Sequence, residues 1–182
     1  MIPPFLQTPI YLWGFMGSGK SALGRRLAHE WGVLFYETDA MVEALAAETI
    51  SNIFRNKGEQ QFRVYERDVL YSIPTNTPAI VATGGGLPCF EDNAQWMLQH
   101  GLTLFLALST EELAARLERS HAARPLLQEK QGSELRSHIQ QMLEVREPIY
   151  RKAHIAIDAN LASSEYLYNI LTRYATQLGL KK

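Results

Sequence analysis

The stretch Gly14-Phe15-Met16-Gly17-Ser18-Gly19-Lys20-Ser21 fits the pattern G-x-x-x-x-G-K-[ST] of a phosphate-binding loop. The apolar run Ile10–Trp13 before it is typical of a strand, and apolar residues recur at helical spacing over residues 22–28. A strand, a glycine-rich turn and a helix in this order form the context that the motif requires. We therefore predict a site for nucleotide phosphates at this turn.

The chemistry of this loop follows from its residue types. Glycines let successive backbone N–H groups converge on phosphate oxygens, and the helix starting near Gly19 points the positive end of its dipole at the same anion. Lys20 is expected to reach the outer phosphates, and the Ser21 hydroxyl is expected to ligate Mg²⁺. A glycine turn that binds nothing is the alternative. The predicted ATP-binding residues of the loop are Gly14, Met16, Gly17, Ser18, Gly19, Lys20, Ser21 and Ala22.

The composition predicts one globular domain over residues 1–182, with 46% hydrophobic and 20% charged residues. A net charge of −1 favours neither nucleic acid nor an anionic membrane as a partner. The single cysteine, Cys89, excludes an internal disulfide framework and a cysteine-based zinc site. Residues 1–5 lack the features of a signal peptide and no apolar run has the length of a membrane span, so we expect a soluble cytoplasmic protein.

Apolar strands alternate with helices after the loop. Further buried strands are predicted at residues 33–36, 79–83, 102–108 and 154–158. Helices are predicted after Asp39 and after Thr49, and over residues 59–71, 91–100, 110–117, 133–147 and 163–178. Thr110 is expected to cap one of these helices, and Pro148 to stop another. This alternation implies an α/β protein with a parallel sheet covered on both faces and ligands at the carboxyl ends of its strands.

Two acidic residues follow the second predicted strand. Glu37 and Asp39 are two positions apart, and the period of a strand places both carboxylates on one side of the chain. Beside a phosphate loop, one carboxylate is suited to hold Mg²⁺ or its waters, and the other to meet a substrate hydroxyl. The alternative is that Asp39 caps the helix beginning at Ala40.

The pattern Gly58-Glu59-x-x-Phe62-Arg63-x-x-Glu66 places three charged side chains on one helical face. Gly58 marks a sharp entry to the helix. We expect Glu66 to hold the fork of Arg63, which would then be presented to a carboxylate in a cleft. A solvated stripe of salt bridges is the alternative.

Three further features are candidates for ligand contacts. The run Gly84-Gly85-Gly86 after the third strand allows close approach of a ligand to the backbone, although a tight corner alone would also use glycine. Arg124, in Arg124-Pro125-Leu126-Leu127, is expected to close over the phosphates as part of a lid, or else to lie in an ordinary surface loop. Arg146 lies at a helix C-terminus, where the helix dipole alone also favours a cation.

Together these segments resemble shikimate kinases. The resemblance runs from about residue 11 to residue 158, with every element in the family's order. The phosphate loop alone belongs to a large superfamily, whereas the pattern at residues 58–66, the triple glycine and the Arg-Pro-Leu-Leu segment are more specific. The resemblance implies a three-layer P-loop fold whose five-stranded parallel sheet has the order 2-3-1-4-5. It also implies substrate-binding helices at about residues 39–72 and a short lid at about residues 118–132.

The resemblance further implies an activity: transfer of a phosphoryl group from ATP, with Mg²⁺, to the 3-hydroxyl of shikimate in aromatic amino acid biosynthesis. We expect a monomer. Arg63 and Arg146 would hold the carboxylate of shikimate, and Asp39 its ring hydroxyls. The implied catalytic residues are Lys20, Asp39 and Arg124, with Arg124 also contacting ATP. The implied substrate-binding residues are Asp39, Arg63, Gly84, Gly85, Gly86 and Arg146, and the implied metal-binding residues are Ser21 and Glu37.

Two positions depart from the family's pattern. Glu37 stands where an aspartate usually helps to hold the Mg²⁺ shell, and its extra methylene would shift that shell or displace a water. Ala47 stands where glycine is usual, in the segment that moves when substrate binds. The arginine beside the adenine is either Arg116 or Arg119, because the spacing before Arg124 varies.

Two other functions compete with this one. A kinase of another small hydroxy acid, such as gluconate, would also use two arginines against a carboxylate. The triple glycine with Arg-Pro-Leu-Leu favours shikimate, and a short lid disfavours a nucleoside monophosphate as substrate. A nucleotide-binding regulator, suggested by Glu37, would bind ATP without releasing ADP in response to shikimate.

Overall fold

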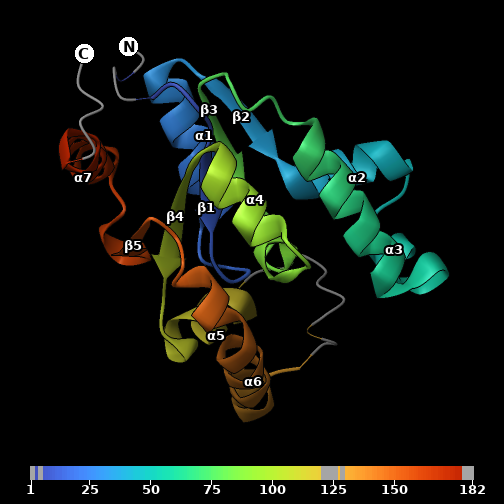
Figure 1. Cartoon of the computed structure of the whole chain (residues 1–182). Coiled ribbons are helices and arrows are strands. Elements are labelled where there is room, and N and C mark those ends of the chain that lie inside the picture. The colour runs from blue at the N-terminus through green and yellow to red at the C-terminus, as the bar shows by residue number, and fades with distance from the viewer. Residues whose placement is uncertain (1–2, 4–5, 120–126, 128–129, 178–182) are drawn as a thin grey trace.

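Five parallel strands form the centre of the molecule (Figure 1). The structure is a computed structural model and describes residues 3, 6–119, 127 and 130–177. The strands are β1 (Ile10–Trp13), β2 (Leu34–Glu37), β3 (Ala79–Ala82), β4 (Leu102–Ala107) and β5 (Ile155–Asp158). Their order in the sheet is β2-β3-β1-β4-β5, and every neighbouring pair is parallel. The predicted fold class and strand order are confirmed.

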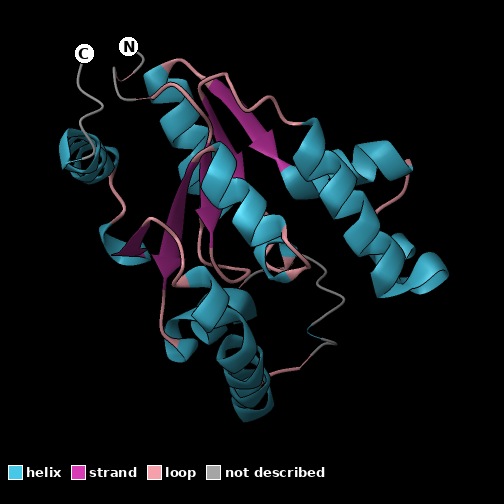
Figure 2. Cartoon of the chain, viewed as in Figure 1, coloured by secondary structure: helices cyan, strands magenta, loops and turns pink. Residues whose placement is uncertain are grey.

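Helices cover both faces of this sheet, which gives three layers (Figure 2). The helices are α1 (Lys20–Trp31), α2 (Thr38–Ala46), α3 (Ile50–Ser72), α4 (Asn93–His100), α5 (Thr110–Glu118), α6 (Gly132–Tyr150) and α7 (Ser164–Gln177). Ile10 and Leu12 of β1 pack with α1 and α7, whereas Tyr11 and Trp13 pack with α3, α4 and the end of α6. This alternation follows from the two-residue period of a strand. Within the described residues, no helix is both long and apolar enough to cross a membrane.

Two helix pairs flank the carboxyl ends of the strands. In Figure 1, α2 and α3 lie on the right, and α5 and α6 lie below the sheet. Each pair has a core of its own: Val42 and Ile53 belong to the first, and Leu113 and Ile139 to the second. The strand arrows in Figure 2 point toward the space between the pairs, so loops that leave the strands arrive there together.

The second strand is not buried, contrary to the prediction. It is an edge strand, because among the described residues β2 pairs only with β3, and Leu34 is 51% exposed. An apolar run of four residues does not distinguish a central strand from an edge strand. The helix that follows exposes Leu45, while Val42 is fully buried.

Local caps set the ends of several helices, and two ends differ from the prediction. Gly32 ends α1 in the left-handed conformation, and the Thr49 hydroxyl accepts from the backbone N–H of Asn52 at the start of α3. Gly58, with φ 82°, kinks α3 where a break between two helices was expected. The cap of α5 is Ser109, one residue before the predicted Thr110. Its side chain accepts from the backbone of Glu112, whose carboxylate in turn accepts from the backbone of Ser109.

The prediction that Pro148 stops α6 is wrong, because the helix continues to Tyr150. A proline inside a helix removes its own N–H donor and its ring crowds the carbonyl four residues earlier, so the carbonyl of Glu144 must turn outward and find another partner. Both residues are exposed, so water can supply one. Three residues further on, the bond from the Arg151 N–H to the Glu147 carbonyl is intact at 2.9 Å.

Ala47 ends α2 with φ 53°, in the left-handed region. Side chains make this conformation unfavourable by roughly 1–2 kcal/mol, whereas glycine adopts it freely. The resemblance noted above places a glycine here. The chain therefore keeps the turn that suits glycine while carrying an alanine.

Candidate active site at the carboxyl ends of the strands

The phosphate loop connects β1 to α1 and surrounds a buried lysine. Lys20 is only 7% exposed, and its Nζ donates to the carbonyls of Gly14 at 2.8 Å and Phe15 at 2.9 Å. Gly14 has φ 144°, and a Cβ there would lie 2.8 Å from the carbonyl oxygen of Leu106. The sharp curl thus requires glycine, and it places a cation at the N-terminus of α1, where an anion is favoured.

Ser21 and Glu37 are the residues predicted to hold Mg²⁺. Ser21 lies in the first turn of α1, and Glu37 is the last residue of β2. Glu37 accepts a hydrogen bond from Arg25 at 2.9 Å. The described part of the chain has no cluster of three or more His, Cys, Asp and Glu side chains able to hold a metal. A nucleotide-bound Mg²⁺ needs few protein ligands, so one hydroxyl and one carboxylate fit the ion, with Arg25 competing for the carboxylate.

The argument that placed Asp39 beside Glu37 was wrong in its geometry. The strand ends at Glu37, and Asp39 lies in the first turn of α2, so the two-residue period does not apply. Asp39 does not cap this helix either, because the N-cap position is Glu37. Its carboxylate faces the triple glycine instead: a Cβ on Gly84 would lie 2.6 Å from Asp39 Oδ1.

Asp39 keeps solvent-exposed surface, as a group that meets a substrate must. Neighbouring protein atoms still displace part of its hydration, and this raises the pKa of the carboxyl group, while the positive charge of Lys20 opposes the rise. A carboxylate whose pKa is raised is a better proton acceptor than an ordinary one.

Arg63 is buried and held from two sides. Its Nη1 donates to Glu66 at 2.5 Å, and its Nε and Nη2 donate to one oxygen of Glu59 at 3.2 and 2.7 Å. These bonds use three of the five guanidinium donors, and two remain for a ligand. Arg63 is 6% exposed and Glu66 1%, so the solvated salt-bridge stripe is excluded for this pair. Burial raises the pKa of Glu66 to about 7, against the opposing effect of Arg63.

The triple glycine is contacted at each of its three residues. The backbone N–H of Gly84 donates to the Thr38 hydroxyl at 2.8 Å, and the Gly85 carbonyl accepts from the Tyr150 hydroxyl. A Cβ on Gly86 would lie 2.4 Å from a guanidinium nitrogen of Arg63, so a side chain at this position would push the guanidinium out of its place.

Thr38 is fully buried. Its contact with Gly84 was not predicted, because the prediction for this segment concerned the acidic residues on either side of Thr38. Tyr150 lies four residues after Arg146 in the chain and was assigned no role from the sequence. No pattern in the sequence indicates that either side chain reaches a glycine more than forty residues away. The Thr38 contact exists because β2 and β3 are neighbours whose carboxyl ends lie together, and the Tyr150 contact exists because the end of α6 packs against the sheet.

Arg146 lies on α6 and faces the same region from the other side. Its guanidinium stands 5.7 Å above the ring of Phe15, in the phosphate loop. Its Nη1 is buried and has no hydrogen-bond partner among the residues that the structure describes. A buried cationic donor without a partner is costly, so this arrangement suits an anionic ligand that is still to arrive.

Arg116, one of the two candidates for the adenine side, lies beside the phosphate loop. It donates to the Ser18 carbonyl at 3.3 Å and to the Asn160 side chain at 2.8 Å. Arg119 is an exposed residue at the end of α5. A hollow of about 420 Å³ opens next to Arg116, between Gly19 on one side and Asn160 on the other.

Arg124 and most of the predicted lid lie outside the described residues. The structure therefore brings together Lys20, Asp39, Arg63, Arg146 and the triple glycine, whereas the role of Arg124 stays a prediction.

A family model described as shikimate kinase matches residues 16–175. The chain belongs to the shikimate kinase family. Its similarity to a curated shikimate kinase of Parabacteroides distasonis is 40% identity over 156 residues, covering 86% of this chain and 90% of that protein. A solved shikimate kinase from Acinetobacter baumannii, in complex with shikimate, matches with a TM-score of 0.81 and 34% identity. That match covers 96% of each chain.

A gluconokinase from Sinorhizobium meliloti shares the fold but much less of the sequence. Its TM-score is 0.57 at 18% identity, over 95% of this chain and 94% of that one. At this level the likeness shows a common fold and says nothing of a common substrate. The solved shikimate kinase therefore matches this chain more closely than the gluconokinase does, both in fold and in sequence.

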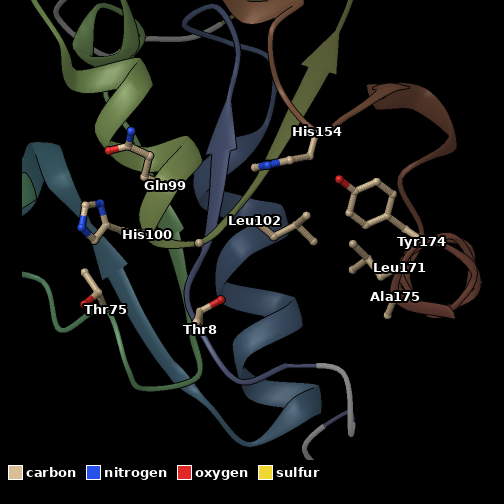
Figure 3. A pocket seen from close by; sticks show the side chains of 10 residues that line it. Thr8, Thr75, Gln99, His100, Leu102, His154, Leu171, Tyr174 and Ala175 are labelled. Carbon is tan, nitrogen blue, oxygen red and sulfur yellow. The ribbon is translucent and has the colours of Figure 1, made fainter. Parts of the chain in front are cut away.

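A second cavity of about 420 Å³ opens at the opposite, amino end of the strands (Figure 3). His154 and Tyr174 stand on one side of it, with their ring centres 6.2 Å apart, and His100 on the other. No Asp, Glu, Lys or Arg is among its described lining residues. His154 Nδ1 accepts from the backbone N–H of Thr103 at 3.1 Å, so this histidine helps to hold the start of β4.

Proposed function

We propose that this protein is a shikimate kinase, which transfers the terminal phosphoryl group of ATP to the 3-hydroxyl of shikimate in aromatic amino acid biosynthesis. One observation carries the assignment. The buried arginine Arg63 lies against the triple glycine that adjoins the phosphate loop, and Arg146, whose Nη1 has no hydrogen-bond partner among the described residues, lies over Phe15 of that loop. A carboxylate held there would place the rest of a small acid within reach of the nucleotide.

The reaction follows from the placement of these groups. Lys20 and the backbone N–H groups of the loop hold the outer phosphates and stabilise the charge that develops during transfer. Arg63 and Arg146 fix the carboxylate and therefore the orientation of the ring. The 3-hydroxyl oxygen then forms a bond to the terminal phosphorus, and the bond from that phosphorus to ADP breaks. Asp39 holds the attacking hydroxyl and is placed to accept its proton.

Two further groups belong to this proposal. Mg²⁺, held by Ser21 and the carboxylate of Glu37 or its waters, would neutralise charge on the phosphates. Arg124 would approach the transferring phosphoryl group as part of the lid. On the nucleotide side, Arg116 would lie against the adenine, because its side chain borders the hollow next to Gly19. We infer a monomeric cytoplasmic enzyme, single-domain over residues 1–182, with neither nucleic acid nor a membrane as partner.

A coupled ADP-release assay of the purified protein tests the assignment. Shikimate, quinate, gluconate and AMP are offered at equal concentrations with ATP and Mg²⁺. Release that depends on shikimate, and is much weaker with the other three, is the expected result. Faster release with gluconate would favour the alternative kinase, and ATP binding without release for any acceptor would favour a nucleotide-binding regulator.

A further inference from the structure

The last turn of α6 carries two side chains that face the site, Arg146 and Tyr150. They are four residues apart, so they share one face of the helix. Pro148 stands between them and removes one backbone hydrogen bond from this turn. A helix end that has lost such a bond is held less firmly by its own backbone, so its contacts with the rest of the protein matter more.

Tyr150 supplies such a contact. Its side chain is fully buried, its ring packs against Phe105 with centroids 5.3 Å apart, and its hydroxyl donates to the Gly85 carbonyl. Burial raises the pKa of this hydroxyl well above neutral pH, so it stays protonated and remains a donor. The bond is therefore present throughout the range in which the enzyme would work.

Gly85 is the glycine that adjoins the phosphate loop. A Cβ placed on it would lie 3.2 Å from the backbone nitrogen of Met16 and 3.6 Å from the Gly14 carbonyl oxygen. One residue thus contacts the phosphate loop on one side and the end of α6 on the other. This short chain of contacts links the end of α6, which carries Arg146, to the phosphate loop.

We propose that Tyr150 is a positioning residue for phosphoryl transfer: its hydroxyl ties the end of α6 to Gly85 and so sets the distance from Arg146 to the phosphate loop. This proposal rests on the shikimate kinase function proposed above. Arg146 would grip the acid, and the bond from Tyr150 would determine how far the gripped acid stands from ATP. Loss of the bond should therefore weaken productive binding of the acid and leave the nucleotide largely unaffected.

The test compares Tyr150→Phe with a matched control, Tyr11→Phe. Tyr11 is also fully buried in the same core cluster, but its hydroxyl has no hydrogen-bond partner among the described residues. Each variant removes one buried hydroxyl and keeps the ring. Tyr150→Phe should raise the KM for shikimate about three- to tenfold, the effect of one lost hydrogen bond, and change the KM for ATP less than about twofold. Tyr11→Phe should change neither value by more than about twofold.

Two outcomes would overturn the proposal. One is a KM for shikimate in Tyr150→Phe that equals that of Tyr11→Phe. The other is an equal rise of both KM values in Tyr150→Phe, which would indicate general loosening of the fold.

A measurement without substrate separates this proposal from the function on which it rests. The Leu87 N–H donates to the Gly84 carbonyl at 3.1 Å, so its hydrogen exchange reports on the triple glycine. Exchange should be faster in Tyr150→Phe than in the parent and unchanged in Tyr11→Phe. If the parent released no ADP with shikimate, the proposed function would fail, while this comparison would still decide whether Tyr150 holds Gly85. Equal exchange in both variants would contradict the positioning role.

Discussion

The two halves of the candidate site are built in different ways. The nucleotide half is one continuous stretch, residues 14–21, and it offers mainly backbone groups and one lysine. The acid half uses side chains from separate elements: Asp39 on α2, Arg63 and Glu66 on α3, and Arg146 on α6. Backbone geometry depends on a short local sequence, whereas the second arrangement depends on the whole fold. Binding of phosphate would therefore depend on one short stretch of sequence, whereas selectivity for the acid would depend on the tertiary structure.

The largest effect is expected in the nucleotide half. Lys20→Met should lower kcat by about 10²–10³-fold, since the lost cation stabilises charge that develops in the transition state. The fold should be retained, because methionine keeps the apolar stem of the side chain. Steady-state kinetics with a melting curve as control provides the check. Activity within a few-fold of the parent would show that the loop is not catalytic.

Substitutions in the acid half should lower the affinity for shikimate. Arg63→Lys and Arg146→Lys should each weaken shikimate binding by about one to two powers of ten, because lysine cannot reproduce a two-pronged contact with a carboxylate. Their effects should not add in the double variant, since the carboxylate can shift toward the remaining arginine. Calorimetry with shikimate tests this, and ATP is the control ligand. Parent-like affinity in Arg63→Lys would remove the main support for shikimate as substrate.

A smaller effect is expected for Arg116, whose side chain contacts the phosphate loop from α5. Arg116→Ala should raise the KM for ATP about two- to fivefold, because its partly exposed contact contributes modestly. Arg119→Ala is the matched control from the same helix end and should leave this KM unchanged. The opposite ranking of the two variants would assign the adenine side to Arg119.

The smallest effect is the pH dependence of shikimate binding, which Glu66 in the acid half should cause. Glu66 has a pKa of about 7, and the carboxylate of shikimate would add negative charge nearby and raise that pKa further. The complex then binds more protons than the free enzyme, so shikimate affinity should fall about two- to threefold as pH rises from 6 to 8. Calorimetry at pH 7 in buffers with different heats of ionisation measures the uptake. Glu66→Gln should abolish it, and uptake that survives would assign the proton to another group, such as Asp39.

The same contrast explains what the sequence could predict. The strand, turn and helix around the phosphate loop, the sharp entry at Gly58 and the helix after Thr49 are each set by neighbouring residues, and the structure has all three. The parallel sheet followed from the alternation of strands and helices, and its strand order from the resemblance to a family.

The failures involve the surroundings of a residue rather than its neighbours in sequence. Periodicity identified β2 as a strand but not as an edge strand, since an edge is defined by the absence of a second neighbour. Pro148 is tolerated in α6 because Pro148 and Glu144 are exposed, so water can bond to the carbonyl that lacks a helical partner. The contacts of Thr38 and Tyr150 with the triple glycine join residues 46 and 65 positions apart, a distance no local pattern spans.

The exposed edge strand has a consequence for handling the protein. One side of β2 offers backbone donors and acceptors that β3 does not use, and Leu34 lies open beside them. Such an edge can act as a template on which a strand from another molecule adds, which is how many aggregates begin. At four residues it is short, which limits this pairing while the fold is intact. If heating were to loosen α2 from the end of β2, the edge would lengthen, so turbidity should first appear below the main melting transition.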